Sequence, residues 1–277
     1  MELGARTRLL AVIGDPVAHS LSPAIQNAAI RALGLDACYL ALRTPASALA
    51  TVLSALAAVG CAGNITVPHK EAVERCLTHK TDLCARIGAC NTFWSERGSL
   101  VGDNTDAAGV LACLRGLGGR ATGAERWLLL GTGGSARAIA VVAADVKTEL
   151  FVRSRDPGRA RTFAEWARSR GARAHAATDR EPPVVDVAIN ATPLGLNADD
   201  PLPLDSDRLK GLKMALDLVY APGETRWVRA LRAAGVTAQD GREMLVQQGA
   251  VAFGRFFPGE SAPVEMMRAA VTRALRA

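Results

Sequence analysis

Residues 127–136, W-L-L-L-G-T-G-G-S-A, decide the fold. An apolar run typical of a buried strand enters a glycine-rich turn, and an alanine-rich helical pattern follows to about Ala144. The turn fits G-x-G-x-x-G/A, in which glycines let the backbone approach a pyrophosphate at a helix N-terminus. A tight turn that binds nothing has the same pattern, but the flanking strand and helix favour a dinucleotide. The predicted contacts are Gly131, Thr132, Gly133, Gly134 and Ser135.

The residues after the next predicted strand, Glu149–Val152, indicate which dinucleotide is bound. An NAD site usually has an Asp or Glu near the end of this strand, which accepts a hydrogen bond from the ribose 2′-hydroxyl. This chain has Ser154 and Arg155 there, followed by Arg159, and arginines suit a 2′-phosphate. Asp156 is a competing acid, but Asp156-Pro157 more simply starts a helix. The pattern therefore favours NADP.

The rest of the chain alternates strand and helix patterns, which predicts an α/β fold with mostly parallel sheets. In the first third we expect strands at Leu9–Ile13, Cys38–Leu42 and Ala62–Val67, and helices over Ser22–Leu33, around Leu49–Leu56 and from His69. Further expected elements are a hairpin from Cys90–Trp94 to Leu100–Val101, a helix over Thr105–Leu117, strands at Val184–Ile189 and Met214–Val219, and two helices within Gly241–Ala277.

A length of 277 residues suggests two domains. We expect a Rossmann-type NADP-binding domain at 106–241, and a mostly parallel α/β substrate domain formed by 1–105 with 242–277. Catalysis is then expected in a cleft between them.

Composition narrows the possible partners. The net charge of +6 could attract nucleic acid or a small anion. The chain has no block of five like charges, and only 4% of its residues are aromatic, so a small anion is favoured over nucleic acid. The six cysteines form no C-x-x-C pair, so we expect no metal site and reduced thiols in the cytoplasm. No stretch is apolar over the 20 or so residues that a membrane span needs. A monomer or homodimer is expected.

Four polar clusters follow predicted strands, where open α/β sheets bind ligands. They lie at 15–23, 64–70, 88–92 and 103–106, and they combine hydroxyl, amide, amine and carboxylate groups suited to a polyhydroxylated anion. Each has a plainer interpretation: Ser22 could cap a helix, Asn64 and Thr66 could satisfy a turn, and 104–106 could start a helix.

These clusters carry a family resemblance. The ordered motifs P-V-x-H-S-L-S-P (16–23), N-I-T-V-P-x-K (64–70), I-G-A-x-N-T (87–92), N-T-D (104–106), G-x-G-G (131–134), N-A-T-P-x-G (190–195), D-L-V-Y-x-P (217–222) and G-x-x-M-L-x-x-Q (241–248) resemble those of shikimate dehydrogenases. The family's N-R-T-x-x-R segment aligns with 154–159, which keeps both arginines but has Ser154 for Asn and Asp156 for Thr.

The resemblance implies NADPH-dependent reduction of 3-dehydroshikimate to shikimate, in the biosynthesis of aromatic amino acids, with Lys70 and Asp106 as the catalytic pair. It implies substrate contacts at Ser20, Ser22, Thr66, Asn91, Tyr220 and Gln248, and further cofactor contacts at Thr192, Leu218 and Gly241.

The pair also makes chemical sense. Hydride addition to a ketone develops an alkoxide that needs a proton donor, and a lysine held by a carboxylate can supply it. His19 and His69 are interpreted as positioning or packing residues. Alternatives are a quinate/shikimate dehydrogenase, an aminoshikimate dehydrogenase, or a cofactor-binding regulator without turnover.

Overall fold

The computed structural model describes residues 3–118, 124–177, 183–205 and 211–276. The chain forms two compact units, Met1–Ala108 with Leu245–Ala277, and Gly109–Met244. The chain passes between the units within helices α5 (Asp106–Gly116) and α9 (Gly241–Phe256). The expected divisions, at 105/106 and 241/242, fall at the starts of these same helices.

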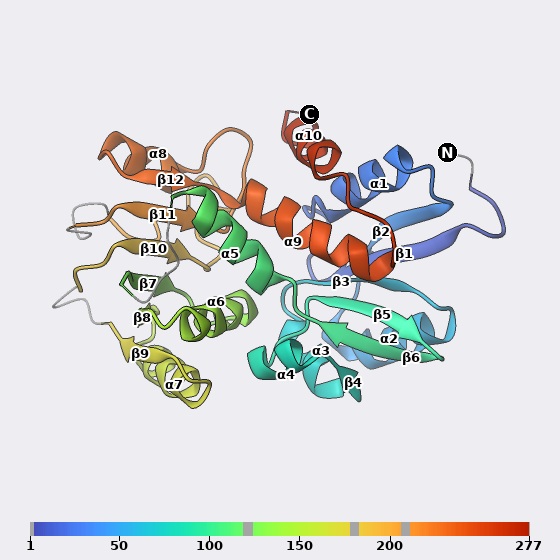
Figure 1. Ribbon diagram of the computed structural model, residues 1–277, viewed down its shortest axis with the longest axis horizontal. Helices are drawn as coiled ribbons and strands as arrows, with labels where there is room; N and C mark the ends of the chain where they lie inside the picture. Colours follow the sequence, from blue (N-terminus) through green and yellow to red (C-terminus); the bar gives the residue numbers. More distant parts are fainter. Residues whose placement is uncertain (1–2, 119–123, 178–182, 206–210, 277) are drawn as a thin grey trace. The chain divides into compact units, whose positions relative to one another are not determined.

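The first unit contains a mixed six-stranded sheet (Figure 1). Its spatial order is β2 (Ala37–Arg43), β1 (Arg8–Gly14), β3 (Ala62–Ile65), β5 (Thr92–Glu96), β6 (Ser99–Asp103) and β4 (His79–Lys80). β1 runs parallel to both of its neighbours, as the alternating β-α pattern predicts. β5 is antiparallel to β3 and to β6, and a hairpin joins β5 to β6.

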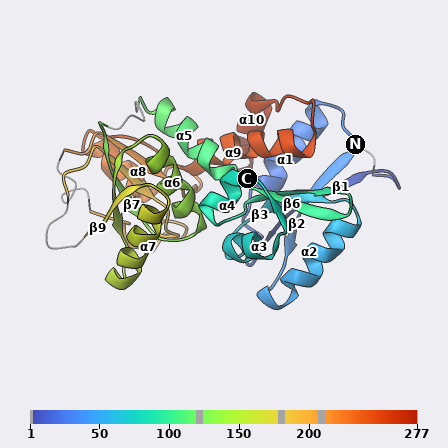
Figure 2. The same cartoon turned by 60° about the horizontal axis from the view of Figure 1, so that its bottom comes forward.

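Helices cover both faces of this sheet. Figure 2 shows α9 with α1 (Ser22–Ala32) and α10 (Val264–Ala274) on one side, and α2 (Leu49–Ala58) with α3 (Lys70–Cys76) on the other. A 3-10 turn, Ala46–Ala48, precedes α2, and the short helix α4 (Asp82–Ile87) precedes β5.

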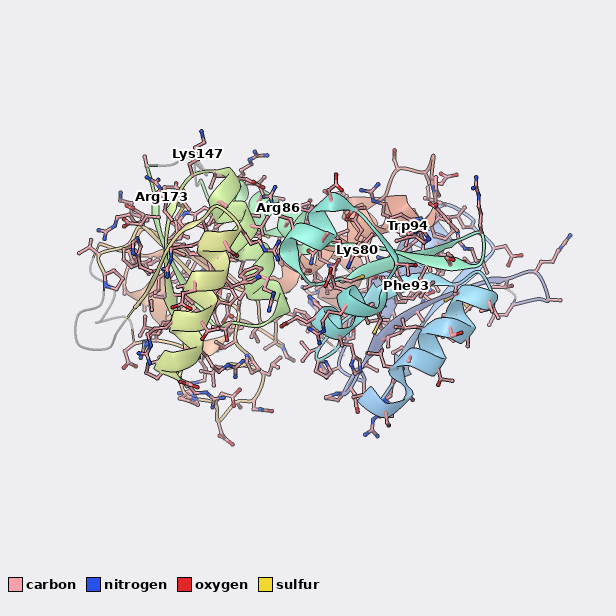
Figure 3. The ribbon with its side chains drawn as sticks, turned by 90° about the horizontal axis from the view of Figure 1, so that it is seen from below. Lys80, Arg86, Phe93, Trp94, Lys147 and Arg173 are labelled. Carbon is pink, nitrogen blue, oxygen red and sulfur yellow. The ribbon has the colours of Figure 1, made fainter. Side chains whose placement is uncertain are left out.

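The alternation of β5 shows how the strands divide their side chains between the two faces. Phe93 is fully buried in the cluster beneath α2, where it shares a core with Leu53 and Ile65. Trp94 points the other way and is partly exposed (Figure 3). Thr92 has the same parity as Trp94, so it faces the α9 side of the sheet.

The second unit has a fully parallel sheet. Its order is β9 (Arg173–Ala176), β8 (Glu149–Arg153), β7 (Arg126–Leu130), β10 (Val187–Asn190), β11 (Met214–Asp217) and β12 (Thr237–Gln239). Numbered along the chain this is 3-2-1-4-5-6, the order of a Rossmann fold, with the topological switch at β7. α6 (Gly134–Asp145) and α7 (Pro157–Ser169) pack on one side, and α8 (Arg226–Ala233) contacts β11 and β12. The expected α/β class, with a Rossmann-type domain, is confirmed.

Several expected boundaries shift. β3 ends at Ile65, β10 begins at Val187 and β11 ends at Asp217, so the expected strands at Ala62–Val67, Val184–Ile189 and Met214–Val219 were too long. The sequence analysis did not predict β4, α4, β9, α8 or β12. The missed strands have two to four residues, too few for a hydrophobic period to show.

Among the described residues, no helix has both the length and the apolar character needed to cross a bilayer.

The close approach of β3 to β1 generates a prediction. A Cβ added to Gly63 would lie 1.8 Å from the backbone carbonyl oxygen of Ala11, which belongs to β1, a strand paired on both sides, and cannot move aside. We therefore expect Gly63→Ala to lower the free energy of unfolding by at least about 2 kcal/mol in urea titrations.

Gly254→Ala is the matched control. Gly254 lies in α9, and its added Cβ would meet nothing within 4 Å. This variant should be as stable as the parent or slightly more stable, since alanine favours a helix. Equal stability of the two variants would contradict the close packing of β3 on β1.

Candidate active site

An ion pair between Lys70 and Asp106 lies at the centre of the polar residues of the first unit. The Lys70 Nζ is 2.6 Å from Asp106 Oδ2, and the two side chains are only 13% and 6% exposed. Each residue is the first of a helix, Lys70 of α3 and Asp106 of α5. A carboxylate at a helix N-terminus is further stabilised by the helix dipole.

The start of α5 is fixed by Asn104. Its Oδ1 accepts a hydrogen bond from the backbone N–H of Asp106 at 3.0 Å, and its Nδ2 donates to the carbonyl of Ala89 at 2.7 Å. The plainer interpretation of 104–106 as a helix start is therefore correct. It does not exclude a functional role, because the same capping presents the Asp106 carboxylate to Lys70.

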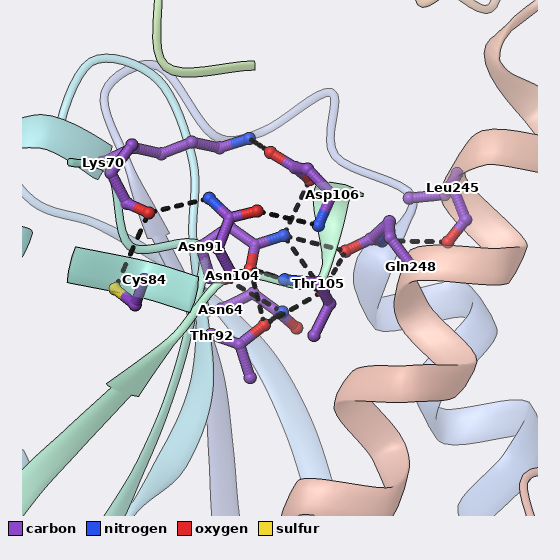
Figure 4. Close-up of polar contacts among 11 residues, drawn as sticks. Asn64, Lys70, Cys84, Asn91, Thr92, Asn104, Thr105, Asp106, Leu245 and Gln248 are labelled. Atoms are coloured by element: carbon purple, nitrogen blue, oxygen red, sulfur yellow. Dashed lines mark hydrogen bonds and ion pairs between the residues drawn. The ribbon is translucent and has the colours of Figure 1, made fainter. Parts of the chain in front are cut away.

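Asn91 holds the second oxygen of the carboxylate, as Figure 4 shows. Its Nδ2 donates to Asp106 Oδ1 at 2.7 Å, while its Oδ1 accepts from the Thr105 backbone N–H at 2.8 Å and from Thr92 Oγ1 at 2.9 Å. Gln248, on α9, lies at the edge of this cluster, with its Oε1 3.5 Å from Asn91 Nδ2. Lys70, Asp106, Asn91 and Gln248 are thus brought together from four separate segments.

The other expected substrate contacts of the first unit lie at strand ends. Ser20 Oγ accepts from the Ser22 backbone N–H at 3.3 Å, and Ser22 is the first residue of α1. The cap position is Leu21, with no side-chain hydrogen bond, so the interpretation of Ser22 as a helix cap is wrong. Thr66 follows β3 and is partly buried.

The two histidines of the motifs differ in environment. His69 is buried, and its Nε2 lies 2.6 Å from the carbonyl oxygen of Thr44, which can only accept, so the ring donates. His19 is exposed. His69 therefore holds the start of α3, consistent with a positioning role.

In the second unit, the glycine-rich turn joins β7 to α6. Gly131 has a φ of +108°, which disfavours other residues, and a Cβ there would lie 2.8 Å from the Ala191 carbonyl oxygen. A Cβ on Gly133 would meet nothing within 4 Å, so the backbone at the N-terminus of α6 is open to a ligand. Thr132, Gly134 and Ser135 complete the turn.

The three residues expected to read the ribose follow β8. Arg155 and Arg159 are exposed, and Ser154 is partly buried. Asp156 caps α7: its Oδ1 accepts from the Gly158 N–H at 2.7 Å. The competing acid thus has a structural role at the helix start, as the Asp156-Pro157 pair predicts.

The remaining expected residues of this unit surround the ends of β10 and β11. Thr192 Oγ1 donates to Asn190 Oδ1 at 2.7 Å, and a Cβ on Gly241 would lie 2.2 Å from the Leu218 carbonyl oxygen. Tyr220 follows β11 in this second unit and is partly buried.

Some polar residues of the first unit were quoted in motifs but given no functional role: Asn64, Thr92, Asn104 and Thr105. Asp103 was included in the polar cluster at 103–106 but was given no functional role either. Its carboxylate is 4% exposed and binds Arg255 Nε at 2.9 Å, Thr81 Oγ1 at 2.6 Å and the Asn104 N–H at 2.8 Å. No sequence signal links Asp103 to Arg255, which is 152 positions away. Within the described ranges, no three His, Cys, Asp or Glu residues are grouped to hold a metal ion.

Comparisons with known proteins find relatives that match nearly the whole chain. The family model described as the shikimate dehydrogenase substrate binding domain matches residues 12–93. A Methanopyrus kandleri protein named shikimate dehydrogenase (NADP(+)) is 38% identical, over 100% of this chain and 99% of its own length. A Methanothrix thermoacetophila protein of the same name is 39% identical, over 97% and 98%.

A solved structure gives the same match in three dimensions. Shikimate 5-dehydrogenase from Thermus thermophilus, in complex with NADP(H) and shikimate, has a TM-score of 0.87 and 36% identity. The match covers 96% of this chain and 99% of that one.

The buried carboxyl of Asp217 generates a prediction. Burial raises its pKa to about 6, although Thr225, Val219 and Asn190 donate hydrogen bonds to it. Since this folded-state value lies above the unfolded one, the group stabilises the fold most at low pH, and its contribution is lost as pH rises through about 6. A ¹³C carboxyl resonance titrating near pH 6 should be present in the parent and absent from Asp217→Asn.

Measurements of unfolding free energy against pH provide a second test of the raised pKa of Asp217. Between pH 7 and about pH 4.5, the parent should gain more unfolding free energy than Asp217→Asn does. A carboxyl midpoint near 4 would show that the hydrogen bonds outweigh burial at this site.

Proposed function

This chain belongs to the shikimate dehydrogenase family, and we propose that Lys70 and Asp106 carry out its proton transfer as NADPH reduces 3-dehydroshikimate to shikimate. The observation that carries this proposal is the buried ion pair, 2.6 Å from Nζ to Oδ2, at the ends of two helices.

Bound NADPH supplies the hydride that reduces the ketone carbon. The ketone oxygen then becomes an alkoxide, and the Lys70 ammonium donates a proton to it. In the reverse direction, the neutral Lys70 amine accepts the proton of the shikimate hydroxyl. The lysine begins α3 directly after a turn, so its backbone is fixed, and little reorganisation is needed at the moment of proton transfer.

Asp106 holds the ammonium in place by charge. Its Oδ2 binds Lys70 and its Oδ1 binds Asn91, yet a carboxylate oxygen can accept more than one hydrogen bond. The remaining lone pairs can accept from a substrate hydroxyl. The carboxylate thus both orients the proton donor and positions the substrate.

The substrate is a polyhydroxylated carboxylate, and the proposed contacts match its groups. Ser20 and Ser22 supply hydroxyls at the start of α1, where the helix dipole favours an anion such as the substrate carboxylate. The proposed partners of the substrate hydroxyls are Thr66, Asn91, Tyr220 and Gln248.

The residues of the second unit fit NADP. The open backbone at Gly133 and the N-terminus of α6 suit a pyrophosphate, and exposed Arg155 and Arg159 suit a 2′-phosphate. The Asp156 carboxylate is not free to turn toward the phosphate, because its Oδ1 accepts a hydrogen bond from the Gly158 N–H. We place Ser154, Thr192, Leu218 and Gly241 in the same binding site.

Steady-state kinetics test the function directly. The ratio of kcat/KM for shikimate with NADP and with NAD, and for quinate with each, separates the proposed activity from quinate/shikimate dehydrogenase activity. Absence of turnover with any of these would favour a cofactor-binding regulator. A cytoplasmic location and a monomer or homodimer stay predictions.

Lys70→Ala should lower kcat by about 10² to 10⁴, the usual range for a positioned acid or base. NADP affinity, measured by fluorescence titration, should be nearly unchanged, because the proposed cofactor residues lie in the second unit. Circular dichroism should show a folded protein.

Lys80→Ala is the matched control. Lys80 also binds a carboxylate at 2.6 Å, that of Glu74, but it lies on β4 and is not part of the Asp106 cluster (Figure 3). Its replacement should leave kcat within about twofold of the parent. Turnover by Lys70→Ala comparable to the Lys80 variant would remove Lys70 from the mechanism.

Arg155→Ala should weaken NADP and leave NAD almost unchanged. It removes a charge-assisted contact of about 1.5–3 kcal/mol to the 2′-phosphate, which shrinks the NADP preference roughly tenfold to a hundredfold. Competitive binding measurements with both cofactors at two salt concentrations check this. Added salt should weaken NADP more than NAD, because only NADP carries the extra phosphate.

Arg161→Ala removes the same charge from an exposed position of α7, two residues beyond Arg159. It should leave the NADP preference intact, which separates a specific contact from the general positive field. Equal weakening of both cofactors by Arg155→Ala would show that another residue reads the ribose.

A further inference from the structure

A buried tyrosine on β2, an edge strand of the sheet, is linked to the proposed catalytic carboxylate. Tyr39 lies on β2, is 0% exposed, and its hydroxyl donates to Asn64 Oδ1 at 2.7 Å. β2 and β3 both pair with β1, so the Tyr39 side chain passes over β1 to reach Asn64. Asn64 is directly opposite Thr92 in the register of β3 and β5.

The orientation of the Asn64 amide is fixed by a group that can only accept. The backbone carbonyl oxygen of Asn91 can only accept a hydrogen bond, and it lies 3.1 Å from the Asn64 side-chain amide, so the Asn64 Nδ2 faces it. The Asn64 oxygen therefore faces Tyr39, and the phenol must donate. Burial raises the pKa of Tyr39, so the phenol keeps the proton that it donates.

Hydrogen bonds continue from Asn64 through Thr92 and Asn91 to Asp106. Asn64 Nδ2 also donates to Thr92 Oγ1 at 3.0 Å, which leaves the Thr92 hydrogen for Asn91 Oδ1, 2.9 Å away. Asn91 Oδ1 also accepts from the Thr105 N–H, so its Nδ2 is turned to Asp106 Oδ1 at 2.7 Å. Every bond in this chain points the same way, from the phenol to the carboxylate.

We propose that Tyr39 is a positioning residue of the reaction, which acts through the donor chain Tyr39–Asn64–Thr92–Asn91–Asp106 to hold Asn91 and the Asp106 carboxylate in place. Tyr39 touches no proposed substrate contact itself. The inference rests on the proposed function of Lys70 and Asp106, and it adds three residues, Tyr39, Asn64 and Thr92, to the machinery that supports them.

Removal of the Tyr39 hydroxyl would take away the first donor of this hydrogen-bond chain. The buried Asn64 oxygen would lose its donor, which is costly in a buried site. The amide cannot turn to find another donor, because its oxygen would then face the Asn91 backbone carbonyl, which can only accept. With its oxygen left unbound, the Asn64 side chain would hold Thr92 less firmly, and Thr92 in turn would hold Asn91 and Asp106 less firmly.

The test is Tyr39→Phe, which keeps the ring and its contact with Phe256 and deletes only the hydroxyl. We expect kcat to fall about tenfold, with KM for shikimate and for NADP within about twofold of the parent. Thr92→Val breaks the same chain in the middle and should lower kcat similarly. The double variant should be no slower than the slower single variant, because both interrupt one path.

Leu53→Ala is the stability control. Leu53 packs in the core on the opposite face of the sheet, so its loss should lower the melting temperature at least as much while leaving kcat nearly unchanged. The proposal is overturned if Tyr39→Phe has the kcat of the parent, if Leu53→Ala lowers kcat equally, or if the two chain variants multiply their effects in the double variant.

The proposed function fails separately. If Lys70→Ala keeps its turnover, the catalytic pair is wrong, whatever Tyr39→Phe does. If Lys70→Ala is inactive and Tyr39→Phe is normal, only the positioning role is wrong.

Discussion

The ion pair between Lys70 and Asp106 depends on one feature of the first sheet, the antiparallel insertion of β5. In a parallel sheet the carboxyl ends of the strands gather at one edge. β5 reverses this, so that the start of β5 meets the carboxyl ends of β3 and β6. In the register, Thr92 pairs with both Asn64 and Asp103. Asn91, immediately before Thr92, therefore reaches the Asp106 carboxylate.

The fold was predictable where sequence periods were long enough to read. The glycine-rich turn after β7 predicted the Rossmann-type unit, and the alternating pattern of the first third predicted three parallel strands. β4 and β12 have only two and three residues, and their pairing is set by neighbouring strands rather than by their own sequence. The antiparallel pairing of β5 with β6 follows from the hairpin at residues 97–98, where Arg97 and Gly98 both adopt positive φ.

The candidate site was predictable through its motifs but not through its contacts. Motifs group residues that are close in sequence. The family resemblance predicted Lys70 and Asp106 as a pair and Asn91 as a substrate contact, and the structure brings these three side chains together, while their roles stay predictions. Tyr39 donates to Asn64 across β1, and Arg255 binds Asp103 from α9. Such contacts depend on strand register and helix packing, which no local pattern encodes. The plainer interpretation of Asn104 was also correct, because one side chain can both cap a helix and aim a catalytic group.

The two units hold their proposed ligand groups by different physical means. In the first unit, buried side chains satisfy one another: Asn64, Asn91, Thr92, Thr105 and Asp106 are each at most 6% exposed. A substitution there leaves a buried partner without its hydrogen bond. In the second unit, the proposed pyrophosphate site consists of backbone groups, and the proposed 2′-phosphate site consists of the exposed side chains of Arg155 and Arg159.

An exposed arginine can be replaced with little cost to the fold, since water solvates whatever remains. Cofactor preference in this architecture can therefore change through single surface substitutions. The proposed catalytic site cannot change in this way, because each member of its hydrogen-bond chain fixes the orientation of the next. The chain departs from the family's cofactor segment at Ser154 and Asp156, while the Lys70–Asp106 pair is intact. Both departures lie in the second unit, after β8, where the neighbouring arginines are exposed and substitutions cost the fold little.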